Sequence, residues 1–197
     1  MKYKEKNLLI DGLKTKTLAQ KYGTPLYCYS YKKLKQNIED FKDNFHQIKP
    51  MICFSVKANS NKTLLKEIGK LGLGADVVSI GELMKVLRSG IKPSKIVFSG
   101  VGKTKNEINY AVDKGILLIN TESKSELLTI EKIGRKKKKK INVGIRLNPN
   151  TDAKTLSQIS TGKKENKFGV LEKTFIDLVK YCKKSKNLNL KCLSVHI

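Results

Sequence analysis

The feature that most constrains the fold is a regular alternation of short apolar runs with longer amphipathic stretches. Six apolar runs follow one another along the chain: MICFSVKA (51–58), ADVVS (75–79), KIVFS (95–99), ILLIN (116–120), INVGIRL (141–147) and KCLSVHI (191–197). Continuous apolar strands are typical of parallel sheets, because helices cover both faces of such a sheet. The pattern therefore predicts an α/β protein built on a parallel sheet.

The stretches between these runs carry apolar residues at helical spacing, and glycines follow several of them. We expect helices at 31–45, 62–71, 81–89, 105–114, 124–133 and 172–184, with Ser30 as the first N-cap and with Gly72, Gly90, Gly115 and Gly134 as stops. No glycine fingerprint of a dinucleotide-binding fold follows the first strand. This favours a (β/α)₈ barrel over a doubly wound sheet, although periodicity does not by itself exclude the second.

The predicted barrel is incomplete, because such a fold needs eight strands and the sequence holds six candidates. The sixth run ends with His196 and Ile197, the last residues of the sequence. A six-stranded piece would leave two sheet edges and an apolar face without partners. We therefore expect the sequence to be a piece of a longer protein, with its barrel truncated after about six strands.

The formal net charge of +24 raises the alternative of a nucleic-acid-binding protein, since cations displace counterions from phosphates. However, only Arg88, Arg135 and Arg146 are arginines, and arginine is the preferred reader of bases and phosphates. The lysines are spread over every predicted helix, and the run 136–140 is expected to be a solvated loop. We prefer lysine-rich coding bias as the explanation and predict neither a nucleic-acid nor a membrane partner.

The four cysteines have neither metal-ligand spacing nor the density of a disulfide scaffold. They are Cys28, Cys53, Cys182 and Cys192, and three of them lie inside apolar runs, which favours buried free thiols. No metal site is predicted. The first apolar stretch, 8–10, is too short for a signal peptide or a membrane span, so we expect a cytoplasmic, soluble protein.

Chemically reactive side chains stand at the carboxyl ends of the predicted strands, where the active sites of barrel enzymes lie. They are Lys57, Asp76, Ser99, Asn120, Arg146 and His196. Burial at the end of an apolar strand would favour the neutral amine of Lys57, which can attack an aldehyde. Position alone leaves an ordinary lysine reaching solvent as an equal alternative. Ser79 and Glu82 have the spacing of a helix capping box and are left out of this set.

Six blocks of the sequence carry a family resemblance. They are KYGTPLYCYS (21–30), FSVKANSN (54–61), GADVVSIGEL (74–83), IRLNPN (145–150), ISTGKKENKFGV (159–170) and SVHI (194–197). In this order they resemble the pyridoxal-phosphate-dependent decarboxylases of the alanine-racemase-like fold, and among these the diaminopimelate decarboxylases. The triplet 156–158, Leu-Ser-Gln, departs from the His-Pro-Tyr-like residues usual before ISTG, which leaves that loop's part in the site unassigned.

The resemblance implies pyridoxal 5′-phosphate as the cofactor and Lys57 as the catalytic lysine that holds it. It also implies that His196 stacks on the pyridine ring. Arg146 is expected to donate to the cofactor or to neighbouring oxygens, and Asp76 to orient groups at the same rim. These four residues form the predicted cofactor-binding set.

The resemblance further implies the decarboxylation of meso-diaminopimelate to L-lysine and CO₂ by a homodimer. In that family the N-terminal segment packs with a C-terminal β-domain, which we expect to be absent here. We therefore divide the chain into this segment, 1–25, and an incomplete pyridoxal-phosphate-binding barrel, 26–197. We expect the piece alone to have no appreciable activity. The alternatives are a related decarboxylase of ornithine, arginine or carboxynorspermidine, and a non-catalytic pyridoxal-phosphate-binding protein.

Overall fold

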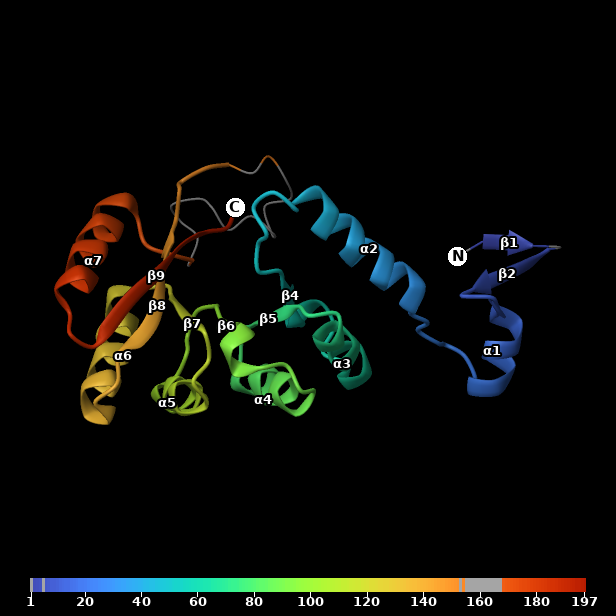
Figure 1. Ribbon diagram of the computed structural model, residues 1–197, viewed down its shortest axis with the longest axis horizontal. Coiled ribbons are helices and arrows are strands. Elements are labelled where there is room, and N and C mark those ends of the chain that lie inside the picture. Colours follow the sequence, from blue (N-terminus) through green and yellow to red (C-terminus); the bar gives the residue numbers. More distant parts are fainter. Residues whose placement is uncertain (1, 5, 153, 155–167) are drawn as a thin grey trace. The chain divides into compact units, whose positions relative to one another are not determined.

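The computed structural model describes residues 2–4, 6–152, 154 and 168–197, and it divides into two compact units, 1–50 and 51–197. The first unit holds an antiparallel sheet of β1 (Lys2–Lys4), β2 (Asn7–Ile10) and β3 (Leu13–Lys14), then the helices α1 (Thr15–Tyr22) and α2 (Tyr31–Asn44) (Figure 1). Ser30 caps α2 as predicted, since its Oγ accepts the N–H of Lys33 at 3.0 Å. We did not predict the small sheet, because strands this short leave almost no alternation in the sequence.

The second unit is built on a six-stranded parallel sheet. Its strands are β4 (Cys53–Ser55), β5 (Gly74–Val77), β6 (Ile96–Phe98), β7 (Leu118–Thr121), β8 (Ile141–Leu147) and β9 (Leu188–Val195). Strands that follow one another in the sequence are also neighbours in the sheet. A doubly wound sheet would reverse its strand order at a switch point, and these six strands do not. The predicted α/β class and the barrel-type succession are therefore confirmed.

Helices separate the strands and cover one face of the sheet. The helical elements are η1 (Val56–Ala58), α3 (Lys62–Lys70), α4 (Ile80–Arg88), η2 (Pro93–Lys95), α5 (Lys105–Lys114), α6 (Lys124–Lys137) and α7 (Glu172–Lys184). Figure 1 shows α3 to α7 along the outer side of the curved sheet. The core lies between these two layers, where Leu65, Leu83 and Leu127 of the helices and Val77, Phe98 and Ile145 of the strands are fully buried. No helix in the described ranges is long and apolar enough to cross a membrane.

Helix α6 runs to Lys137, so the prediction that Gly134 ends this helix was wrong. Gly134 is buried inside the helix, where an added Cβ would lie 3.0 Å from the carbonyl oxygen of Lys139 and 3.2 Å from that of Asn187. Glycine serves here for a close backbone approach and not for a turn. The loop expected at 136–140 is likewise wrong in part, because its first lysines lie in the last helical turn, where the helix dipole favours cations.

All four cysteines are free, as predicted, but only Cys182 is fully buried. Cys53 and Cys192 are half-buried, and their side chains lie on the sheet face opposite α3 to α7; Cys28 is exposed. Burial raises the pKa of the Cys53 and Cys182 thiols to about 11. Both are therefore protonated at neutral pH and are poor nucleophiles.

Candidate functional site

The sheet face opposite the helices carries polar side chains, because successive residues of a strand point to opposite faces. The registers of β5 to β8 align Asp76, Ser99, Asn120 and Arg146 on this face, near the carboxyl ends of their strands. Parallel strands end at one common edge. Four of the six residues selected from the sequence are therefore gathered along this edge by the register alone.

Lys57 and His196 reach this edge from the two outermost strands of the sheet. Lys57 lies in the turn η1, two residues after β4, and His196 directly follows β9. Both residues are exposed, so of the two alternatives left open for Lys57 the lysine that reaches solvent is observed. β4 ends at Ser55, before the lysine is reached. The charges of Lys57 and His196 both act on the carboxyl group of Asp76. The predicted amine and imidazole are therefore both within electrostatic range of the predicted carboxylate.

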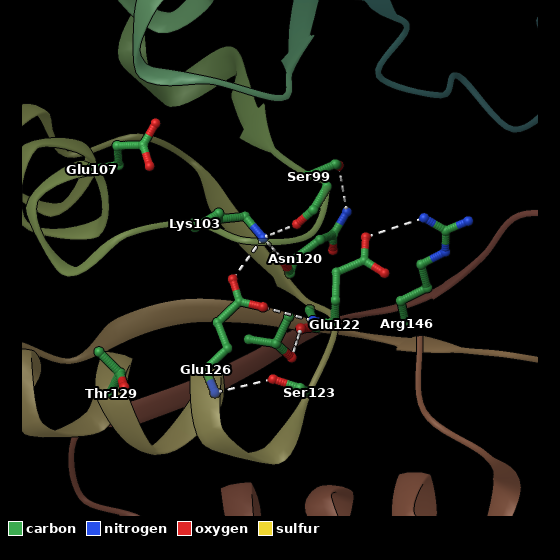
Figure 2. A network of polar contacts seen from close by, with 12 residues as sticks. Ser99, Lys103, Glu107, Asn120, Glu122, Ser123, Glu126, Thr129 and Arg146 are labelled. Atoms are coloured by element: carbon green, nitrogen blue, oxygen red, sulfur yellow. Dashed lines mark hydrogen bonds and ion pairs between the residues drawn. The ribbon is translucent and has the colours of Figure 1, made fainter. Parts of the chain in front are cut away.

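Asp76 is held by a short hydrogen-bonded chain. The Ser99 hydroxyl donates to Asp76 Oδ1 at 2.5 Å. The Asn120 amide donates through Nδ2 to Ser99 Oγ at 3.1 Å (Figure 2). Burial raises the pKa of Asp76, and the hydrogen bond from Ser99 and the charge of Lys57 oppose that rise. The sequence predicted that these residues share a rim, but the directed contacts between them depend on the fold.

Arg146 is bound to a buried carboxylate that we did not predict. Its Nη1 lies 3.1 Å from Oε1 of Glu122, whose side chain is 3% exposed. Oε2 of the same carboxylate accepts the backbone N–H of Gly169 at 2.9 Å, and the Arg146 guanidinium lies over the Phe168 ring, 4.9 Å from its centroid. Glu122 follows strand β7 directly, so a search two residues beyond each apolar run would have found it.

A buried lysine, Lys103, lies beside this edge and was also missed. Its Nζ donates to the carbonyl oxygens of Gly100 and Asn120 at 2.6 and 2.7 Å, and to Glu126 Oε1 at 2.6 Å. The side chains of Lys103 and Glu126 are 1% and 9% exposed. Figure 2 shows this cation between the loop after β6 and the first turn of α6. In a chain so rich in lysine, no sequence signal distinguishes it.

The comparison with known protein families decides where this chain belongs. Residues 31–197 match the family described as "Pyridoxal-dependent decarboxylase, pyridoxal binding domain". The chain belongs to this family. Its fold is accordingly that of a pyridoxal-binding barrel domain, which confirms the family resemblance of the sequence blocks and the cofactor predicted from them.

Several relatives of this pyridoxal-binding domain are diaminopimelate decarboxylases. The diaminopimelate decarboxylase of Helicobacter pylori (strain J99) is 49% identical over 180 residues, which are 91% of this chain and 44% of that protein. The diaminopimelate decarboxylase of Aquifex aeolicus is 42% identical over the whole chain and 46% of its own length. A crystal structure of the M. jannaschii enzyme with L-lysine is 35% identical, with a TM-score of 0.91 over 100% of this chain and 47% of that one. The chain thus spans somewhat less than half the length of these relatives.

Two other sequence-based expectations concern segments beside the edge of this pyridoxal-binding domain. Ser79 caps α4 as predicted, since its Oγ accepts the N–H of Glu82 at 3.2 Å, while Glu82 Oε2 accepts the N–H of Val78 at 2.8 Å. Leaving both residues out of the site is consistent with this structural role. The triplet 156–158 and most of the block 159–170 lie outside the described residues.

Gly144 provides the space into which Asn120 fits. A Cβ at position 144 would lie 2.0 Å from Asn120 Oδ1 and 3.2 Å from Cys192 Cβ. We therefore expect Gly144→Ala to displace the Asn120 amide and to lower the free energy of unfolding by about 1–3 kcal/mol, measured by urea denaturation. Gly81→Ala is the matched control, because its nearest atom is Ser79 Oγ at 3.8 Å, and alanine inside helix α4 should stabilise by about 0.5–1 kcal/mol. Equal effects of the two substitutions would contradict this packing argument.

Proposed function

We propose that this chain is the pyridoxal-phosphate-binding part of a diaminopimelate decarboxylase, which converts meso-diaminopimelate to L-lysine and CO₂. The observation that carries the proposal is the position of Lys57 at the carboxyl edge of the sheet, where its charge and that of His196 act on Asp76. Membership of a pyridoxal-binding family supports it, and so do the names of the Helicobacter pylori and Aquifex aeolicus relatives.

The chemistry of this edge fits the cofactor. Lys57 offers an exposed primary amine, the group that bonds to the aldehyde of pyridoxal phosphate. His196 offers a flat, polar ring for stacking, and Arg146 and Asp76 offer charges of opposite sign for polar substituents. When bound, pyridoxal phosphate supplies an electron sink for the bond that breaks as CO₂ leaves.

Each residue has a definite task in this proposal. Lys57 holds the cofactor and exchanges it with the amine of the substrate, so it is the catalytic residue. His196 keeps the cofactor ring in place, and Asp76 orients the groups around the lysine. Arg146 donates toward the cofactor from a position fixed by its ion pair with Glu122 and by its contact with Phe168.

The identity of the substrate rests on the relatives. The names of the Helicobacter and Aquifex proteins and the L-lysine in the M. jannaschii structure support diaminopimelate. We also propose that 1–25 pack with a C-terminal β-domain in the complete enzyme and that 26–197 belong to one barrel. As the family resemblance implies, the complete enzyme would be a cytoplasmic homodimer, and its mass in solution measured by light scattering tests this.

The substrate proposal is tested by CO₂ release from the enzyme at the length of its relatives, loaded with pyridoxal phosphate. We expect kcat/KM for meso-diaminopimelate to exceed that for ornithine, arginine or carboxynorspermidine by at least about a hundredfold, because a site built for its second carboxylate rejects analogues that lack this group. A preference for another amine would instead indicate a related decarboxylase. Cofactor binding without CO₂ release from any of the four would indicate a non-catalytic pyridoxal-phosphate-binding protein.

A further inference from the structure

A directed chain of hydrogen bonds runs from a buried lysine to the carboxylate of the candidate site. Lys103 Nζ donates to the backbone oxygen of Asn120 at 2.7 Å, and the Asn120 side chain donates to Ser99 Oγ at 3.1 Å. Ser99 in turn donates to Asp76 Oδ1 at 2.5 Å. A serine hydroxyl has a single proton. Because Ser99 accepts from the asparagine amide, its own proton is directed to Asp76, which must act as an acceptor.

Asn120, in the middle of this series of hydrogen bonds, is buried with one polar atom unsatisfied within the described part of the chain. Asn120 is only 8% exposed, and its Oδ1 is buried without a hydrogen-bond partner among the described residues. An unsatisfied buried oxygen is unfavourable, so an amide is rarely kept in such a place for stability alone. Gly144 leaves room for this oxygen, and the buried Lys103 fixes the backbone beneath it. Of the two polar atoms of the side-chain amide, Nδ2 is hydrogen-bonded, to Ser99 Oγ, and, over the described ranges, Oδ1 is not.

We propose that Ser99 and Asn120 are positioning residues of the cofactor site, which hold Asp76 as an oriented carboxylate within range of Lys57 and His196. This inference rests on the proposed function of that site. The Ser99 hydroxyl donates a hydrogen bond to Oδ1 of the carboxylate and so fixes the rotation of the Asp76 side chain. Neither residue bonds to the cofactor in this scheme, and both act through Asp76.

The electrostatic surroundings of Asp76 agree with this arrangement. The titratable groups that act on it or on which it acts are Lys57 of η1, Glu82 of α4, His196 after β9 and Cys53 of β4. Burial raises the pKa of Asp76, and the Ser99 hydrogen bond is the largest influence that lowers it. Removing the Ser99 hydroxyl should therefore raise the pKa of Asp76. As the pH falls, the carboxylate would then be lost at a higher pH than in the unmodified protein.

The test measures the affinity of the apo-enzyme for pyridoxal phosphate by absorbance titration, at a series of pH values from neutral to acid. We expect Ser99→Ala to weaken binding about tenfold at neutral pH, as for the loss of one charge-assisted hydrogen bond. As the pH is lowered, this variant should also begin to lose affinity for pyridoxal phosphate at a higher pH than the unmodified enzyme does. Ser99→Thr keeps the hydroxyl and should restore both values. Ser89→Ala, which removes a hydroxyl bonded to the Lys85 carbonyl at the C-terminal end of helix α4, should change neither.

The outcomes separate this inference from the proposed function. The positioning role would be overturned if folded Ser99→Ala enzyme kept the same affinity at neutral pH and lost it at the same acid pH as the unmodified enzyme. It would also be overturned if Ser99→Thr failed to restore these two values. If Ser99→Ala does not fold, Ser99→Cys replaces it, since a thiol preserves the shape but donates weakly. If instead the unmodified enzyme binds no pyridoxal phosphate through Lys57, the proposed function itself is wrong.

Discussion

Replacing Lys57 with alanine is expected to abolish the absorbance band of the lysine-bound cofactor and to lower decarboxylation by more than about a thousandfold. The physical reason is that Lys57 supplies the only covalent attachment in the proposed scheme. Non-covalent contacts, such as the stacking expected of His196, would remain and could still retain some cofactor. The measurement is the near-ultraviolet and visible spectrum of the purified enzyme after addition of pyridoxal phosphate, followed by CO₂ release from diaminopimelate.

The control for this substitution is a neighbouring lysine that is equally accessible. Lys62, the first residue of α3, is also exposed, and Lys62→Ala should leave both the band and the rate close to those of the unmodified enzyme. Borohydride reduction should then fix the cofactor to Lys57 in the control and in the unmodified enzyme. Persistence of the band in Lys57→Ala, or label on another lysine, would refute the assignment.

Replacing Lys103 with methionine is expected to lower the free energy of unfolding by about 3–5 kcal/mol. The substitution removes the lysine that forms an ion pair with the buried Glu126 carboxylate and leaves the carbonyl oxygens of Gly100 and Asn120 without this donor. An uncompensated buried charge costs far more than the pair contributes, so the effect should exceed that of most single substitutions. Urea denaturation followed by circular dichroism measures it.

Two further variants show whether charge burial is the cause. Adding Glu126→Gln to Lys103→Met removes the unpaired buried charge but keeps an acceptor near the start of the helix. The double variant should recover about half of the lost free energy of unfolding. Lys35→Met breaks an ion pair with Glu39 whose side chains are 51% and 48% exposed, and should cost less than about 0.5 kcal/mol. If the surface and buried substitutions were equally costly, the buried pair would have no special role.

Local patterns were sufficient for much of the fold and for the members of the predicted site. Apolar runs and helix-capping residues act over a few neighbouring positions, so the six strands, the helices at 105–114 and 172–184 and the caps Ser30 and Ser79 could be predicted. The helix end predicted at Gly134 was wrong because the sequence does not distinguish a glycine that ends a helix from one that allows close packing. Which of the two it is depends on the carbonyl oxygens of Lys139 and Asn187.

The carboxyl-edge position of the reactive residues followed from the sequence, because parallel strands of a barrel must present their ends together. The partners of those residues came from tertiary contacts. Glu122 receives the N–H of Gly169, which is 47 positions away, and Lys103 reaches Glu126 across 23 positions. The exposure of Lys57 likewise depends on where β4 ends within the sheet. Such contacts join segments distant in the chain and follow no periodic pattern, so the register and curvature of the folded sheet bring them about.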